Sequence, residues 1–286
     1  MKRFQILLVF LFLSIILYGQ TNKRNKIIAN SAIFGFSAGS QIALYNVWYK
    51  EYQNGSFHFF NDSQEWGYMD KFGHVYSAFQ ISNNLHKLYM SVGYSKKESI
   101  YLSSAVGFLY QLNIEIMDGF SDGWGFSLSD LFSNSVGIAM HCFSNSFSAP
   151  FLFPKFSYSP TPYAAIRPNI LGEKSFARIL KDYNGQTYWL SICTNKFLPS
   201  SPKWLLFSVG YSVNERLVGS ATHYENGSEV YSAYPQYLFS LDFDLSKIPV
   251  KNKFLKTTFG LLNTIKVPFP ALGYEKRAFR IYPIYF

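Results

Sequence analysis

The chain has 286 residues, of which 20% are aromatic and only 15% are charged, and its formal net charge is +9. Low charge combined with many aromatic side chains excludes a disordered chain and indicates extensive burial or a membrane boundary. No basic patch interleaved with stacking aromatics occurs, so we expect no nucleic-acid partner. The basic balance instead favours a membrane or another anionic lipid surface as the partner.

The first twenty residues are typical of a secretory signal peptide. Two basic residues precede an apolar run, 6–17, that is shorter than a spanning helix of about 20 residues. Small Gly19 suits a peptidase, which predicts export and cleavage beside it; an uncleaved anchor is the alternative. The two cysteines, Cys142 and Cys193, lie far from this segment, so no acylation site is expected there. We expect two separately buried thiols rather than a disulfide, although pairing stays open.

Residues 27–147 predict an apolar bundle of four helices, because long stretches carry no charge and capping residues divide them. The expected helices cover 27–49, 69–90, 95–118 and 127–143. Capping boxes predict two of the starts, with Ser95 and Glu98 before the third helix and Ser127 and Asp130 before the fourth.

Residues 148–172 contain five prolines and predict a linker, after which residues 173–286 alternate with period two. Strands are expected at 187–194, 204–213, 237–245 and 279–286. The predicted class is therefore α+β, a four-helix bundle followed by an antiparallel sheet or a small or partial barrel. A basic amphipathic helix at 252–265 interrupts the strands, and we expect it to pack over the sheet. The alternative is that it lies on a membrane surface.

Each of three apolar helices carries one polar stripe at helical spacing, and the economical arrangement points the stripes at one another. The candidate catalytic residues are Asp70, His74, Glu115, Asp118 and Asp130. The remaining members, expected in a structural network, are Lys71, Gln111, Asn134, Gly137 and His141. Such a cluster serves as a metal site, an acid–base pair, a ligand site or a structural network, and the sequence identifies no metal or cofactor.

Four ordered motifs carry a family resemblance: Asp70-Lys71-x-x-His74, Glu115-x-x-Asp118-Gly119, Gly125-Phe126-Ser127-x-x-Asp130 and Asn134-x-x-Gly137. They resemble the YfiM-like predicted periplasmic lipoproteins (domain of unknown function family 2279) and, more distantly, the VanZ-like membrane proteins. The resemblance covers roughly residues 30–140, and the second half resembles the longer form from Bacteroidetes-type bacteria. It implies the periplasm or outer membrane of a Gram-negative cell and no established reaction.

These observations predict an exported, non-catalytic cell-envelope protein associated with the outer membrane. The first alternative is a membrane-associated hydrolase or transferase that acts on a lipid or cell-wall precursor through the His and carboxylate residues. The second alternative is a module that binds a hydrophobic ligand between the bundle and the sheet.

Overall fold

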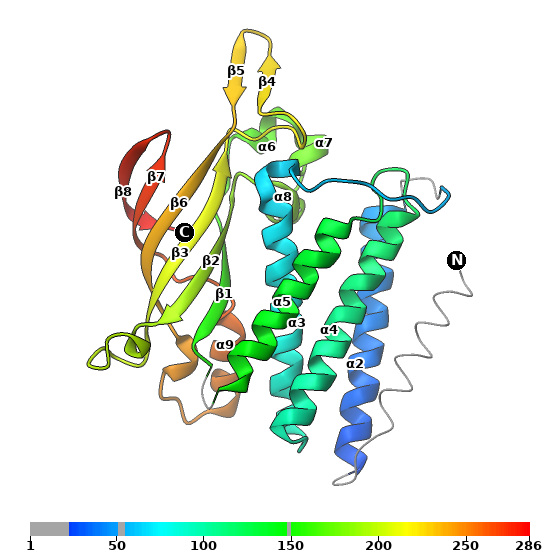
Figure 1. Ribbon diagram of the computed structural model, residues 1–286, viewed down its shortest axis with the longest axis vertical. Helices are drawn as coiled ribbons and strands as arrows, with labels where there is room; N and C mark the ends of the chain where they lie inside the picture. Colours follow the sequence, from blue (N-terminus) through cyan, green and yellow to red (C-terminus); the bar gives the residue numbers. More distant parts are fainter. Residues whose placement is uncertain (1–22, 51–54, 148–149) are drawn as a thin grey trace. The chain divides into compact units, whose positions relative to one another are not determined.

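Figure 1 shows the computed structural model of the protein, which describes residues 23–50, 55–147 and 150–286. The predicted signal peptide, residues 1–20, lies outside the described residues. The described chain is α+β, with helices first and then a six-stranded antiparallel sheet, as the sequence predicts. Contacts divide the chain into two compact units: unit 1 comprises residues 1–61 and 77–145, and unit 2 comprises residues 62–76 and 146–286.

The long helices of the first half match the predicted spans within a few residues. They are α2 (Lys23–Leu44), α3 (Met69–Ser91), α4 (Lys96–Gly119) and α5 (Leu128–Ser146), and short turns lie at Tyr45–Tyr49 and Glu65–Tyr68. The predicted four-helix bundle is not confirmed as a self-contained domain, because the first two turns of α3 count with unit 2.

Capping residues define the start of α4 and of α5, as the sequence predicts. The Ser95 hydroxyl accepts the Glu98 N–H, and the Glu98 carboxylate accepts the Ser95 N–H at 2.8 Å, which completes a reciprocal box. At α5 the Ser127 hydroxyl accepts the Asp130 N–H at 3.1 Å. These bonds satisfy backbone donors that the helix itself leaves without acceptors.

Helix α2 packs inside unit 1 through a few polar and apolar contacts. Asn30 donates to the Tyr94 hydroxyl at 2.9 Å, and Ile33 joins a buried cluster with Tyr89, Tyr94 and Val106. Other large apolar residues of α2 are exposed, including Phe36 at 79%. By length and composition α2 is long and apolar enough to cross a membrane, a criterion that core helices and signal sequences also meet.

Unit 2 contains eight strands among its described residues, most of them in one sheet. The strands are β1 (Leu152–Tyr158), β2 (Gln186–Cys193), β3 (Leu205–Asn214), β4 (His223–Asn226), β5 (Glu229–Ser232), β6 (Tyr234–Phe243), β7 (Phe269–Glu275) and β8 (Ala278–Tyr285). Its helices are α6 (Tyr163–Ile166), α7 (Pro168–Leu171), α8 (Ser175–Lys181) and α9 (Lys253–Leu262), with short turns at Thr194–Lys196 and Leu245–Lys247.

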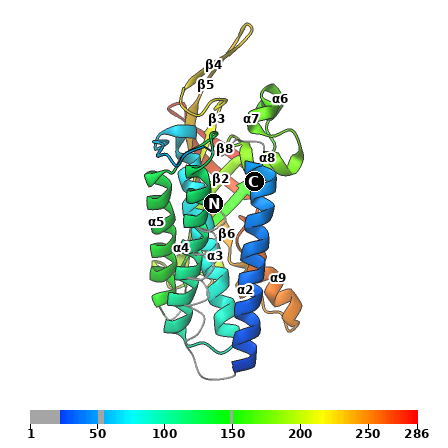
Figure 2. The same cartoon turned by 90° about the vertical axis from the view of Figure 1, so that its right-hand side faces the viewer.

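The main sheet is antiparallel with the order β1-β2-β3-β6-β7-β8, and it does not close into a barrel. It curls enough for side chains of β2 and β8 to meet, since the Thr187 and Tyr285 hydroxyls lie 3.1 Å apart. Within β1, the backbone of Phe156 bonds with the segment after α9: its N–H donates to the Thr264 carbonyl, and its carbonyl accepts the Lys266 N–H. Figures 1 and 2 show the β4–β5 hairpin extending from the sheet at the end away from α9.

Two expectations for this half need correction. The segment 148–172, expected to be a linker, contains β1, α6 and α7, and β1 pairs with β2 along its whole length. Helix α9 does not bury the apolar face that was expected to cover the sheet: Phe254 is 76% exposed and Leu261 is 54% exposed.

Candidate functional site

A strained turn precedes α3 in unit 2. Trp66, Gly67 and Tyr68 all have positive φ, at 51°, 60° and 66°. For the two residues that carry a Cβ this left-handed conformation costs about 1–2 kcal/mol each. The surroundings hold the turn: the Trp66 N–H donates to the Gly219 carbonyl at 2.9 Å, and the Tyr211 hydroxyl donates to the Gly67 carbonyl at 2.8 Å. Strained backbone that is held in this way is common at functional sites, and charged residues follow this turn directly.

Asp70 stands at the centre of a charged cluster on the first turns of α3. Lys71 Nζ lies 2.7 Å from Asp62 Oδ1 and 2.9 Å from Asp70 Oδ2. The other Asp70 oxygen accepts the Tyr183 hydroxyl at 3.2 Å and lies 3.7 Å from His74 Nε2. Burial alone raises the pKa of Asp70, but the charges of His74 and Lys71 outweigh burial and lower it. Asp70 is therefore held as a carboxylate.

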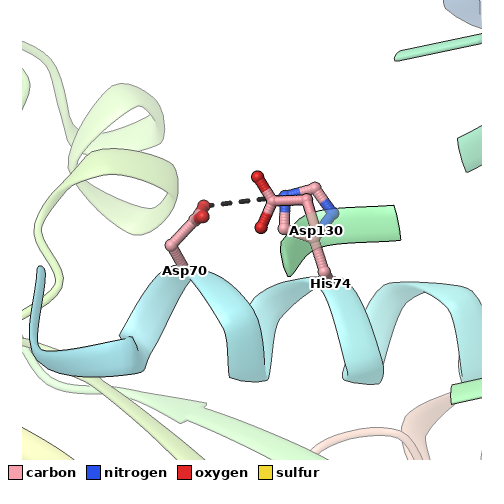
Figure 3. Close-up of side chains that lie close together, drawn as sticks. All are labelled: Asp70, His74 and Asp130. Carbon is pink, nitrogen blue, oxygen red and sulfur yellow. Dashed lines mark ion pairs between the residues drawn. The ribbon is translucent and has the colours of Figure 1, made fainter. Parts of the chain in front are cut away.

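Figure 3 shows Asp70 and His74 one turn apart on the same side of α3, and the dashed line marks the ion pair between them. Each of these two side chains offers one ligand atom, and Asp70 Oδ1 lies 3.7 Å from His74 Nε2. A carboxylate oxygen and an imidazole nitrogen are donors that suit a divalent transition ion.

In unit 1 a second, fully buried network joins α4 to α5. The Gln111 amide donates to Asn134 Oδ1 at 2.9 Å and to the Ser77 hydroxyl at 2.8 Å. Asn134 in turn donates to Glu115 Oε1 at 3.0 Å. Glu115 and Asn134 are completely shielded from solvent, and Gly137 is buried on the same face of α5. The predicted polar stripes of α4 and α5 thus bond to each other as a structural network does.

Asp118 pairs with a residue from earlier in the chain. Its Oδ1 accepts the Tyr49 hydroxyl at 2.7 Å, and burial together with the Asp118 charge raises the pKa of Tyr49. The sequence placed Asp118 in the catalytic group beside Glu115. Tyr49 lies just after α2, on a different segment from Asp118, so helical spacing in the sequence could not link Tyr49 with Asp118.

His141 belongs to a third buried cluster. Its Nε2 lies 2.9 Å from the Ser103 hydroxyl, and its Nδ1 lies 3.0 Å from the Asn145 amide nitrogen. Burial, and then the nearby His86, lower the pKa of His141 to about 4. Serine, histidine and asparagine in this order resemble a nucleophile, a base and an orienting group. Ser103 and His141 are completely buried, and the lowered pKa leaves the His141 imidazole uncharged at neutral pH.

Comparison with known families covers the helical half of the chain. Residues 57–146 match the family described as predicted periplasmic lipoprotein (DUF2279). No curated protein and no solved structure matches the chain. The family description agrees with an exported protein of the cell envelope and assigns no reaction.

The matched segment contains every candidate residue that the sequence singled out, from Asp70 to His141. Their assignment as catalytic residues stays a prediction, as does the choice between a metal site and an acid–base pair. The likeness to VanZ-like membrane proteins stays a resemblance carried by the motifs alone. Residues 147–286, which contain the sheet, lie outside the match.

The sheet of unit 2 has polar side chains on its buried face. Lys155 and Asp242 form an ion pair of 2.8 Å with both side chains fully buried, and the Ser191 hydroxyl lies 2.7 Å from that of Ser208. Lys266 donates to the Leu241 carbonyl at 2.9 Å, and burial lowers its pKa to about 8. The alternation of apolar with small or polar residues in β3 and β6 was the sequence signal for this arrangement, but it singled out neither Lys155 nor Lys266.

The opposite face of the sheet is apolar and exposed. Register alignment places Val209, Phe239, Leu272 and Ile281 side by side across β3, β6, β7 and β8. Their exposed fractions are 39%, 38%, 41% and 80%. The neighbouring row continues the pattern with Tyr237, Tyr274 and Phe279. On the buried face Gly210 has no side chain to accommodate, and the Trp189 ring fills the space where a Cβ would lie.

Proposed function

We propose that the protein is a non-catalytic envelope protein that associates with the outer membrane through the apolar face of its sheet. One observation carries the proposal, namely the inverted polarity of that sheet. A sheet in water turns its polar face outward. Here Lys155, Asp242 and Ser208 are buried, whereas Phe239 and Ile281 on the opposite face are exposed.

The extent of the exposed apolar surface favours a lipid environment. Contiguous apolar patches of this kind mark interaction sites, because water solvates them poorly. Alternation of apolar outward and polar inward residues is the pattern of a lipid-facing β wall. The open order of the strands favours a sheet that rests in the membrane interface.

Cell fractionation tests this proposal directly. We expect the protein in the outer-membrane fraction, and release by alkaline carbonate as a peripheral protein. The paired change Ile281→Ser and Ile284→Ser, at positions 80% and 75% exposed, should move protein into the soluble periplasmic fraction. Val230→Ser is the matched control, since Val230 is 63% exposed on the β4–β5 hairpin outside the main sheet. Wild-type protein found wholly in the soluble fraction would refute the proposal.

A second candidate function rests on Asp70 and His74. The ion pair between them follows a strained turn and offers a base and a carboxylate on one side of α3. This arrangement favours a membrane-associated enzyme that acts on a lipid or cell-wall precursor. A His74→Ala variant that keeps its melting temperature but loses a measured envelope activity would favour this alternative.

A further inference from the structure

One end of the sheet in unit 2 combines exposed apolar side chains with lysines. The residues are 194–204, which connect β2 to β3, and 244–268, which connect β6 to β7. Strand register brings the two connections together, since Leu206 aligns with both Cys193 and Asp242. We call these two segments the lysine end.

Hydrogen bonds fix α9 to this end of the sheet. The Asn263 side chain accepts the Leu245 N–H at 2.9 Å and donates to Asp244 Oδ1 at 3.0 Å. The Asp244 N–H in turn donates to the Trp204 carbonyl at 2.8 Å, and the Trp204 ring stacks on Phe243. The connection that carries α9 is therefore bonded to the connection that carries Trp204.

Many apolar side chains of the lysine end are exposed and are not covered by the rest of unit 2. Phe254 is 76% exposed and Phe197 is 62% exposed. The other exposed apolar residues of these segments are Leu198, Trp204, Ile248, Leu255, Leu261, Leu262 and Ile265. Aromatic rings and leucines on a short amphipathic helix can insert into the boundary between lipid headgroups and acyl chains, where their apolar surface is removed from water.

The charges of the lysine end have one sign. Its exposed lysines are Lys196, Lys203, Lys247, Lys251 and Lys256. Asp244 is the carboxylate of these segments, and it is 1% exposed because it is bonded inside. Exposed lysines with no exposed carboxylate among them attract an anionic surface, and each contributes about 1 kcal/mol near such a membrane.

We propose that the lysine end docks on an anionic bilayer surface, with Phe254 and its apolar neighbours in the headgroup boundary and the lysines on lipid phosphates. The inference rests on the proposed function. It adds to that proposal the class of lipid that is bound and the end of the sheet that contacts the membrane. Zwitterionic lipid offers the same apolar boundary without the net negative charge, so the lysines supply the selection.

Vesicle flotation of the purified full chain tests the inference. Phosphatidylcholine vesicles with added phosphatidylglycerol should bind the protein more tightly than phosphatidylcholine alone, and salt should weaken that preference. The paired change Lys251→Gln and Lys256→Gln should lower affinity for the anionic vesicles roughly 30-fold. It should leave binding to phosphatidylcholine unchanged. The change Phe254→Ser with Leu261→Ser should weaken binding to both kinds of vesicle.

The matched control removes two positive charges elsewhere in unit 2, with Lys174→Gln and Arg277→Gln, both exposed. Equal loss of affinity in the control and in the lysine variant would overturn the inference, because net charge alone would then explain binding. Equal binding of wild type to both vesicles would overturn it as well, while leaving the proposed function intact. Failure to bind either vesicle would refute the proposed function itself. Circular dichroism of each variant confirms that the fold is retained.

Discussion

Lys155 Nζ lies 2.8 Å from Asp242 Oδ2, and both side chains are completely buried beneath the sheet. Burial lowers the pKa of Lys155, and the Asp242 charge opposes that effect. The pair is sustained by further bonds, since the Val267 N–H donates to Asp242 and Lys155 donates to the Phe243 carbonyl. The two residues thus tie β1 to β6 and to the segment that leads into β7.

Removing one member of this pair should be strongly destabilising. Asp242→Asn or Lys155→Met leaves a buried charge without its counter-charge, which costs about 3–5 kcal/mol of unfolding free energy. Urea denaturation measures the loss. The double variant Lys155→Met with Asp242→Leu should recover most of it, because apolar residues of similar volume replace such pairs at little cost. A double variant no more stable than the singles would contradict this account.

The network around Asn134 makes a second prediction. Asn134→Asp places a carboxylate beside Glu115 in a site shielded from solvent, whereas Asn134→Leu removes polarity and leaves the partners unsatisfied. We expect the leucine variant to lose about 2–4 kcal/mol, for two lost bonds. We expect the aspartate variant to lose more at neutral pH and to regain stability at acidic pH, as the carboxyl group is protonated. Thermal denaturation at two pH values distinguishes them.

His141 predicts an acid-sensitive fold. Its pKa in the folded protein is about 4, below the ordinary 6.5, so the unfolded chain binds the proton more readily. The stability is therefore complete above pH 6.5 and falls as the pH drops toward 4, by up to about 3 kcal/mol. Urea midpoints between pH 4 and pH 7 measure this slope. His141→Gln should flatten it, and an unchanged slope in that variant would assign the acid sensitivity to other groups.

The Asp70 and His74 pair predicts metal affinity. Purified protein should bind Zn²⁺ in equilibrium dialysis, and Asp70→Asn or His74→Ala should remove that binding. Exposed His223 on the β4–β5 hairpin is the control, because His223→Ala should leave binding unchanged. If the wild type retains no zinc while His74→Ala lowers the melting temperature, the cluster is structural.

Export makes the fifth prediction. The mature protein should begin near Gly19 or Gln20, because a peptidase removes the basic and apolar segment before it. N-terminal sequencing of protein from the cell envelope gives the answer. A mature chain that still begins at Met1 would support the uncleaved anchor instead.

The sequence predicted elements that carry their own local signals and missed those that depend on distant partners. The start of α4 followed from Ser95 and Glu98, which bond to each other three residues apart. Strand β1 was missed because Pro154 interrupts its pattern, yet Pro154 pairs with Leu190 at the edge of the sheet, where a missing N–H is tolerated. Strand β7 was missed because Pro270 and Gly273 hide its alternation.

The site was predicted in part for a similar reason. Helical spacing placed Asp130, Asn134 and His141 on one face of α5, and all three are buried there. Eleven residues separate Asp130 from His141, which is about 16 Å along a helix. One cluster therefore cannot gather both ends of the stripe, and His141 bonds Ser103 and Asn145 instead. The alternation within β3 and β6 indicated an apolar face, but only the register shows that Val209, Phe239, Leu272 and Ile281 lie side by side on it.

The division of α3 between the units has a consequence for how the chain acquires its structure. Unit 2 needs residues 62–76 as well as residues 146–286, so its contacts close a loop of about seventy residues that contains most of unit 1. Contacts of such long sequence separation form slowly, because the loop entropy is lost before they stabilise the chain. The sheet cannot be completed until β8, the last strand, has been synthesised. A nascent chain therefore holds residues 62–76 without most of their unit until residues 146–286 have been synthesised, which delays the folding of unit 2.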